Sequence, residues 1–226
     1  LRSAEGRRIG IEHAILVLGL PRRSKVMREA TETLAAFGAP RSVGVRVWGV
    51  LGVVPLGAKL VGAIDLVLSV FSGEEPAWVD AVYLPRGART VASAGAGTVG
   101  RREDGDSLRG LSGDLSALVR MSDGRGAVMQ VSDQGAGDGF ELTMLSAQGR
   151  LVMTEQGFSW RAPDGSLRDE HRSPGTCDVY ADGFQFGAKD EGPLALERVL
   201  TAAQTAILSA RTGQPESPAT IVAMGK

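Results

Sequence analysis

Reactive side chains are scarce in this sequence of 226 residues. Cys177 is its only cysteine, which excludes an internal disulfide and any zinc site built on several thiolates. The only histidines are His13 and His171, the second of which we expect in a polar loop. Their contexts are unrelated, so we expect no cysteine-histidine pair and no metal site. A single thiol is typical of a reducing compartment, and it favours a cytoplasmic location.

An excess of either charge is also missing. The 25 basic and 26 acidic residues nearly cancel, which gives no electrostatic reason to expect nucleic acid or an anionic membrane as partner. The most apolar stretch, 45–71, is interrupted by Arg46, Pro55, Lys59 and Asp65. Each charge near a bilayer centre would cost about 2.5 to 3.5 kcal/mol, so a strand followed by a core helix is favoured over a membrane span. Small molecules and proteins remain as partners.

Two glycine-rich stretches have some features of ligand-binding loops, but their sequence context favours ordinary connecting loops. GAGTVG at 95–100 has the spacing of a dinucleotide-binding turn. The polar, glycine-broken RREDGDSLRG follows it, so no helix N-terminus is available for the phosphates. Asp133 and Asp138 in SDQGAGDG lack the alternating ligands and closing glutamate of a calcium loop, and we expect them to be turn residues.

Hydrophobic periodicity predicts two strand-helix units, then hairpins, then a closing helix. We expect Ser24 to cap the first complete helix and Gly38 to end it. The expected strands and helices of the first part are 11–20, 24–38, 41–50, 56–71 and 77–85. The hairpins are expected within 117–133, 140–157 and 158–170, as one antiparallel meander, and the last helix at 193–212. This order indicates a single α+β domain over residues 1–226.

Some of the predicted strands are apolar on both faces. In 127–131, Ala127, Met129 and Val131 point to one side of the sheet, and Val128 points to the other. If helices cover only one side, the second side needs a partner surface. The pattern therefore predicts a homo-oligomer formed through the open sheet face.

Lys59 and Asp65 are charged residues in the apolar helix 56–71. Buried charges need partners, and such exceptions concentrate at functional sites, so both are candidate substrate-binding residues. They are six positions apart and do not share a helical face, so they need not act together. The alternative interpretation is that Asp65 bonds a neighbouring loop for structural reasons alone.

The order of these segments resembles a known family. The stretches GAIDLVLSVFSGEEPAWVDAVYL, LSALVRMSDGRGAVMQVSD and FELTMLSAQGRLVM, together with the ending VLTAAQTAILSARTGQPESPATI, are similar to the C-terminal domain of the Gfo/Idh/MocA family of NAD(P)-dependent oxidoreductases. The resemblance runs from about Ile11 onward. It implies an open mixed, largely antiparallel sheet with helices packed on one face, which binds a sugar, polyol or related carbonyl compound and mediates oligomerisation.

In that family NAD or NADP is held by a preceding Rossmann domain, which we expect to be absent from residues 1–226. The chain starts with leucine, so we expect it to begin inside a longer product. Family members place a histidine three residues before the aspartate that matches Asp65, and another aspartate four residues before that histidine. Gly62 and Ala58 stand there in this sequence, and glycine cannot relay a proton.

This chain alone is therefore expected to be inactive and to bind no cofactor. Lys59 is a speculative substitute for the missing histidine. Two hypotheses stay open. One is a substrate-binding and oligomerisation domain of such an oxidoreductase, and the other is a non-catalytic subunit that docks a protein partner through its open sheet face.

Overall fold

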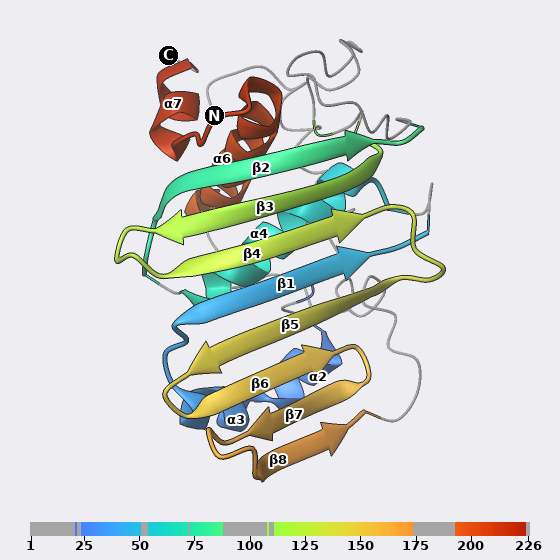
Figure 1. Cartoon of the computed structure of the whole chain (residues 1–226), viewed down its shortest axis with the longest axis vertical. Helices are drawn as coiled ribbons and strands as arrows, with labels where there is room; N and C mark the ends of the chain where they lie inside the picture. The colour runs from blue at the N-terminus through green and yellow to red at the C-terminus, as the bar shows by residue number, and fades with distance from the viewer. Residues whose placement is uncertain are drawn as a thin grey trace.

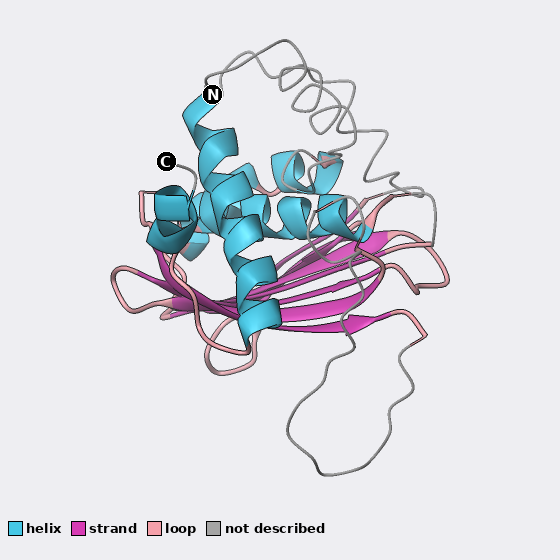
Figure 2. Cartoon of the chain, turned by 90° about the horizontal axis from the view of Figure 1, so that it is seen from above, coloured by secondary structure: helices cyan, strands magenta, loops and turns pink. Residues whose placement is uncertain are grey.

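The computed structural model describes residues 21, 24–50, 54–71, 73–87, 108, 111–173 and 193–224. The expected strand at 11–20, the glycine-rich stretch at 95–100, His13 and Cys177 lie outside the described residues. Within the described part, eight strands form one sheet. Figure 2 shows that the described helices all lie on one side of this sheet.

The elements follow the predicted order. The strands are β1 (Ser42–Trp48), β2 (Pro76–Pro85), β3 (Gly113–Met121), β4 (Gly126–Ser132), β5 (Gly139–Ser146), β6 (Gly149–Thr154), β7 (Gly157–Arg161) and β8 (Leu167–Arg172). The helices are α2 (Lys25–Glu29), α3 (Thr31–Phe37), α4 (Leu56–Val70), α6 (Pro193–Thr212) and α7 (Pro218–Met224). None of these helices is long and apolar enough to cross a membrane.

The first predicted helix is divided in two. Ser24 caps α2 as expected, with its hydroxyl oxygen accepting from the Met27 amide, and Gly38 ends α3 with a φ of 73°. Between them Ala30 has a φ of −86° and a ψ of 7°, which interrupts the single helix that the sequence predicts. Ala30 is fully buried, so this bend turns an apolar methyl group into the core.

The strand order is β2-β3-β4-β1-β5-β6-β7-β8 (Figure 1). β1 is parallel to β4 and antiparallel to β5, and the other neighbours are antiparallel. The prediction of one uninterrupted meander is therefore wrong between β4 and β5, where β1 is inserted. Val43, Val45 and Val47 of β1 are each at most 2% exposed, and a central place in the sheet buries them under the helices.

The helices cover the two halves of the sheet separately. α4 and α6 pack over β1 to β4, whereas α2 and α3 cover β6 to β8 (Figure 1). Phe37 of α3 meets Trp160 of β7 edge to face at 5.8 Å, and Thr33 donates a hydrogen bond to Asp169 of β8. The predicted open sheet with helices on one face is thus confirmed.

The outer edge of β2 is closed by the C-terminal part of the chain. Val79 and Glu216 exchange two backbone hydrogen bonds of 2.8 and 2.9 Å, and the Ala81 amide donates to the buried Ser209 hydroxyl of α6 at 2.9 Å. β8 forms the other edge and consists mostly of charged residues.

Candidate functional site

Both predicted site residues lie on α4, which is buried between the sheet and α6. The helix starts directly after Pro55, whose fixed φ suits a helix start. Its side chains are apolar nearly all round, as expected for a helix without a solvent face. Lys59 is 1% exposed and Asp65 is 7% exposed, so both charged groups lie inside the protein.

Lys59 points to the carboxyl end of β1. Its Nζ donates a hydrogen bond of 3.0 Å to the Val54 carbonyl. The side chain also lies against Gly49, where a Cβ would be 2.9 Å from Nζ. Burial lowers the pKa of Lys59, and the nearby carboxylates of Asp138 and Asp133 oppose part of that change. The ammonium group is therefore held between a carbonyl and two acidic side chains.

The acidic partners come from the loop between β4 and β5. Asp133 is 2% exposed and its Oδ1 accepts from the Gly113 amide at 3.0 Å. Asp138 accepts from the Val50 amide at 3.0 Å. The prediction that these are turn residues is confirmed, but their closeness to Lys59 was missed. The only sequence signal was the position of two aspartates in a glycine-rich loop after a buried strand.

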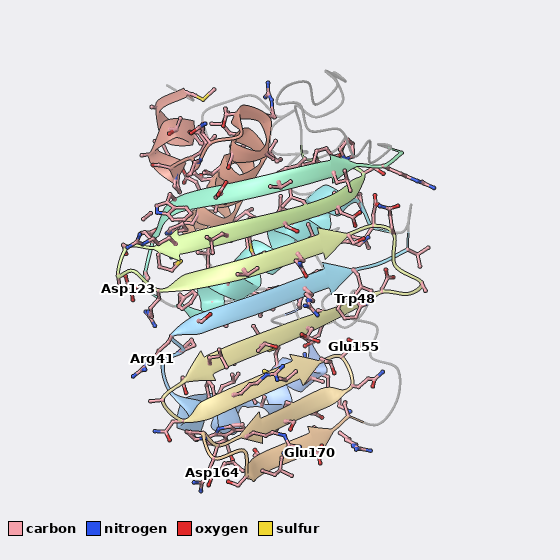
Figure 3. All side chains as sticks on the ribbon, in the orientation of Figure 1. Arg41, Trp48, Asp123, Glu155, Asp164 and Glu170 are labelled. Atoms are coloured by element: carbon pink, nitrogen blue, oxygen red, sulfur yellow. The ribbon has the colours of Figure 1, made fainter. Side chains whose placement is uncertain are left out.

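Trp48 fixes the same loop from the open side of the sheet. It is the last residue of β1, as Figure 3 shows, and its indole ring lies against Gly139 at the start of β5. A Cβ on Gly139 would be 2.6 Å from the Trp48 Cζ2 atom, so only glycine fits there. The Gly135 amide donates to the Gly49 carbonyl at 3.1 Å, which ties the loop to the end of β1.

Asp65 lies on a different side of α4 from Lys59. Gly62 is three positions from Asp65 and three from Lys59, so around the helix it lies between these two residues. A Cβ at Gly62 would be 3.2 Å from the Pro21 Cδ atom, so Pro21 lies where a side chain at position 62 would begin. The structure therefore does not bring Lys59 and Asp65 together, in agreement with their spacing.

His171 lies in β8, and the expectation of a polar loop was wrong. Its ring stacks on Phe158 with centroids 5.6 Å apart, and its Nε2 is 3.1 Å from a Glu29 carboxylate oxygen of α2. It thus helps to dock α2 on β8, which is the edge strand, whereas α4 packs on β1, β3 and β4. No group of three side chains suited to a metal ion occurs in the part of the chain that the structure describes.

Sequence comparisons give no relatives: no protein-family profile and no curated protein matches this chain. Solved structures do match. UDP-N-acetylglucosamine 3-dehydrogenase GnnA from Acidithiobacillus ferrooxidans is 16% identical, with a TM-score of 0.58 over 86% of this chain and 60% of that one. The apo scyllo-inositol dehydrogenase from Lactobacillus casei is 14% identical, with a TM-score of 0.59 over 89% and 62%.

GenD2 from gentamicin A biosynthesis, solved in complex with NAD, is also 14% identical, with a TM-score of 0.59 over 88% of this chain and 62% of its own. The chain thus spans 60 to 62% of the length of these three proteins. At these identities the likeness concerns the fold, and at that level it confirms the predicted similarity to the C-terminal domain of oxidoreductases of the Gfo/Idh/MocA type.

Proposed function

We propose that this chain, with the fold of that C-terminal domain, is the substrate-binding and oligomerisation domain of an NAD(P)-dependent oxidoreductase acting on a sugar, polyol or related carbonyl compound. The observation that carries the proposal is the structural match, which covers 86 to 89% of this chain and 60 to 62% of three dehydrogenase structures. The rest of those structures leaves room for a nucleotide-binding domain of ordinary size. NAD or NADP would be bound there and would exchange a hydride with the substrate carbon.

Asp65 is the proposed substrate-binding carboxylate of this domain. An ionised carboxylate accepts strong hydrogen bonds from hydroxyl groups, which are the recognition features of sugars and polyols. Gly62, three positions before Asp65 on α4, has no side chain to take up the hydroxyl proton that is lost when a hydroxyl becomes a carbonyl. That proton must therefore pass to a group other than residue 62.

Lys59 remains a proposed second substrate contact. Burial lowers its pKa, which brings the ammonium group closer to the range in which it can release a proton. Its Nζ is hydrogen-bonded to the Val54 carbonyl and is nearly inaccessible to solvent. Contact with a substrate therefore requires Nζ to leave that carbonyl.

Calorimetric titration of the chain with a panel of inositols, sugars and nucleotide sugars tests this function. We expect saturable binding of one of these classes and none of NADH or NADPH. Asp65→Asn should weaken the binding by more than about tenfold, whereas Asp80→Asn on the open sheet face should leave it unchanged. Saturable NADH binding by this chain would contradict the proposal. So would sugar binding whose affinity is unchanged by Asp65→Asn.

A non-catalytic scaffold is the second candidate. It is favoured because Pro21 lies against Gly62, at the position where the family resemblance implies a proton-transferring histidine. In that case the open sheet face would dock a protein and no chemistry would take place. The mass and activity of the natural gene product separate the two candidates. A product with a nucleotide-binding domain that oxidises a polyol supports the enzyme, and one that neither binds nucleotide nor turns over substrate supports the scaffold.

A further inference from the structure

The loop between β4 and β5 has two fixed ends. At its start the Asp133 amide donates to the Gly113 carbonyl at 3.1 Å, and the Gly113 amide donates to Asp133 Oδ1 at 3.0 Å. At its other end the Trp48 ring lies against Gly139, where only glycine fits. Residues 134–138 connect these two points, and we call them the flap. Figure 1 shows the loop projecting beyond the ends of β4 and β1.

The flap itself is held by few contacts. In the described part of the chain, three hydrogen bonds join it to residues distant in the sequence: the Gly135 amide to the Gly49 carbonyl at 3.1 Å, Gln134 Nε2 to Asp114 at 2.8 Å, and the Val50 amide to Asp138 at 3.0 Å. All of its residues except Gly135 are exposed, and the space around Gly137 is open. A segment that buries so little apolar surface opens more easily than the strands beside it.

The flap covers the amine of Lys59. Lys59 is 1% exposed, whereas Asp138 of the flap is exposed. A Cβ at Gly49 would be 2.9 Å from the Lys59 Nζ and would overlap the Asp138 carboxylate. The two charged groups therefore approach each other at the place where residue 49 has no side chain, with the amine on the buried side and the carboxylate on the exposed side.

The closed flap holds this ammonium group with too few partners. Burial lowers the pKa of Lys59, and the attraction of Asp138 and Asp133 opposes only part of that change. Within the described residues, the Val54 carbonyl accepts the single hydrogen bond of Nζ, although an ammonium group has three protons to donate. Opening of the flap would let water reach the other two protons, so the open form recovers hydration that the closed form lacks.

We propose that the flap is a lid over Lys59, hinged at Asp133 and Gly139, whose opening releases the amine from the Val54 carbonyl. The lid follows from contacts within the chain, whereas the meeting of the released amine with a substrate rests on the proposed function. In that function Lys59 contacts a substrate only after Nζ has left Val54, and the lid supplies this step. Gly135 and Gly137 give the flap the backbone freedom to move.

Reductive methylation with formaldehyde and cyanoborohydride, mapped by peptide mass spectrometry, distinguishes a lid from a static core lysine. The chain has four lysines, Lys25, Lys59, Lys189 and Lys226, and Lys25, whose side chain is 42% exposed, is the internal reference. We expect Lys59 of the folded chain to react more than about tenfold more slowly than Lys25. Its rate should change little in dilute urea, because a local opening exposes little surface.

Two results with the wild-type chain would overturn the lid. Lys59 that reacts as fast as Lys25 is not covered. Lys59 whose rate rises with urea as steeply as global unfolding is released only when the whole chain unfolds.

Asp138→Ala tests the flap directly. It removes the carboxylate above Nζ and the acceptor of the Val50 amide, so we expect Lys59 to react more than about fivefold faster while Lys25 is unchanged. Asp164→Ala is the matched control, because Asp164 is also an exposed turn aspartate and accepts from the Ser166 amide at 2.9 Å between β7 and β8. Equal Lys59 rates in the two variants would contradict the lid.

Gly49→Ala displaces the flap without removing a charge. Its Cβ would overlap the Asp138 carboxylate, and the backbone at Gly49 is outside the left-handed region, so alanine can adopt it. We expect the same acceleration at Lys59, whereas Gly137→Ala, in open space within the flap, should leave the rate nearly unchanged. A Gly49→Ala chain that protects Lys59 as well as wild type does would refute the lid. No sugar enters these measurements, so failure of the lid is distinguishable from failure of the proposed substrate binding.

Discussion

Lys59 places a charged amine inside an apolar helix, and its surroundings explain how the fold tolerates it. The Val54 carbonyl accepts its hydrogen bond, and the acidic side chains of Asp133 and Asp138 offset part of the loss of hydration. A buried charge without such partners would cost several kcal/mol. The residue therefore joins α4 to the end of β1 and to the loop between β4 and β5.

The pKa of Lys59 gives a pH-dependent stability. Burial makes this pKa lower in the folded chain than in the unfolded chain, where it is near 10.5. Between the two values the unfolded chain binds more protons, so the free energy of unfolding rises with pH through that window. Urea unfolding from neutral pH to 10.5 should therefore show wild type gaining stability relative to Lys59→Met. A difference that falls as pH rises would contradict the buried ammonium.

The packing around Gly62 leads to a prediction about histidine, the residue that the family resemblance would place at this position. Pro21 lies 3.2 Å from the position of its Cβ, so Gly62→His must displace Pro21. We expect a loss of about 1 to 3 kcal/mol in the free energy of unfolding, as for other overpacked sites. Ser69→His, at a half-buried position of the same helix, is the control and should cost less. Equal losses would show that the Pro21 contact has no effect.

At the level of elements, α6 contributes more than its apolar stripe. Ser209 is fully buried and accepts the hydrogen bond of the Ala81 amide at the β2 edge. Ser209→Ala leaves that amide buried without an acceptor, and we expect a loss of about 1 to 3 kcal/mol. Ser69→Ala is the matched control, because its hydroxyl only donates to the Leu66 carbonyl within α4. Thermal unfolding of both variants measures the difference, and indistinguishable variants would refute the role of Ser209.

The elements show what local sequence determines here. The hairpins at Asp123-Gly124 and Asp164-Gly165 were predicted because each glycine adopts a positive φ, 88° and 84°, that its turn requires. The place of β1 between β4 and β5 was not predicted, because its pairing with β4 depends on residues far away in the chain. The division of α2 from α3 involves no proline or glycine. α7 was not predicted either, although Ser217 and Pro218 form a helix-start signal.

The candidate site was likewise predicted only where it depends on local sequence. An apolar helix with two buried charged residues could be predicted from the spacing of its side chains. The acidic partners of Lys59 lie on a distant loop, and the contact of Pro21 with Gly62 joins segments separated by α2, α3 and β1. Such contacts depend on the folded backbone, so no local pattern predicts them.

At the level of the whole molecule, the two halves of the sheet differ in how they are held. β1 and β4 lie in the middle under α4, whereas β8 is a charged edge strand held to α2 and α3 partly by polar contacts. Hydrogen exchange should therefore release the amides of β8 well before those of β1 and β4, through local opening of this end. Exchange of all three strands at one common rate would argue against separate halves.

The closed edge of β2 determines how copies of this chain can accumulate. Glu216 and Ser209 occupy the amides of Val79 and Ala81, and charged side chains crowd the opposite edge. A foreign strand therefore meets a partly occupied backbone at β2 and a row of charged side chains at β8, and the helices screen one face of the described sheet. Fibril growth by addition of strands at these two edges is therefore disfavoured when molecules of this chain crowd together.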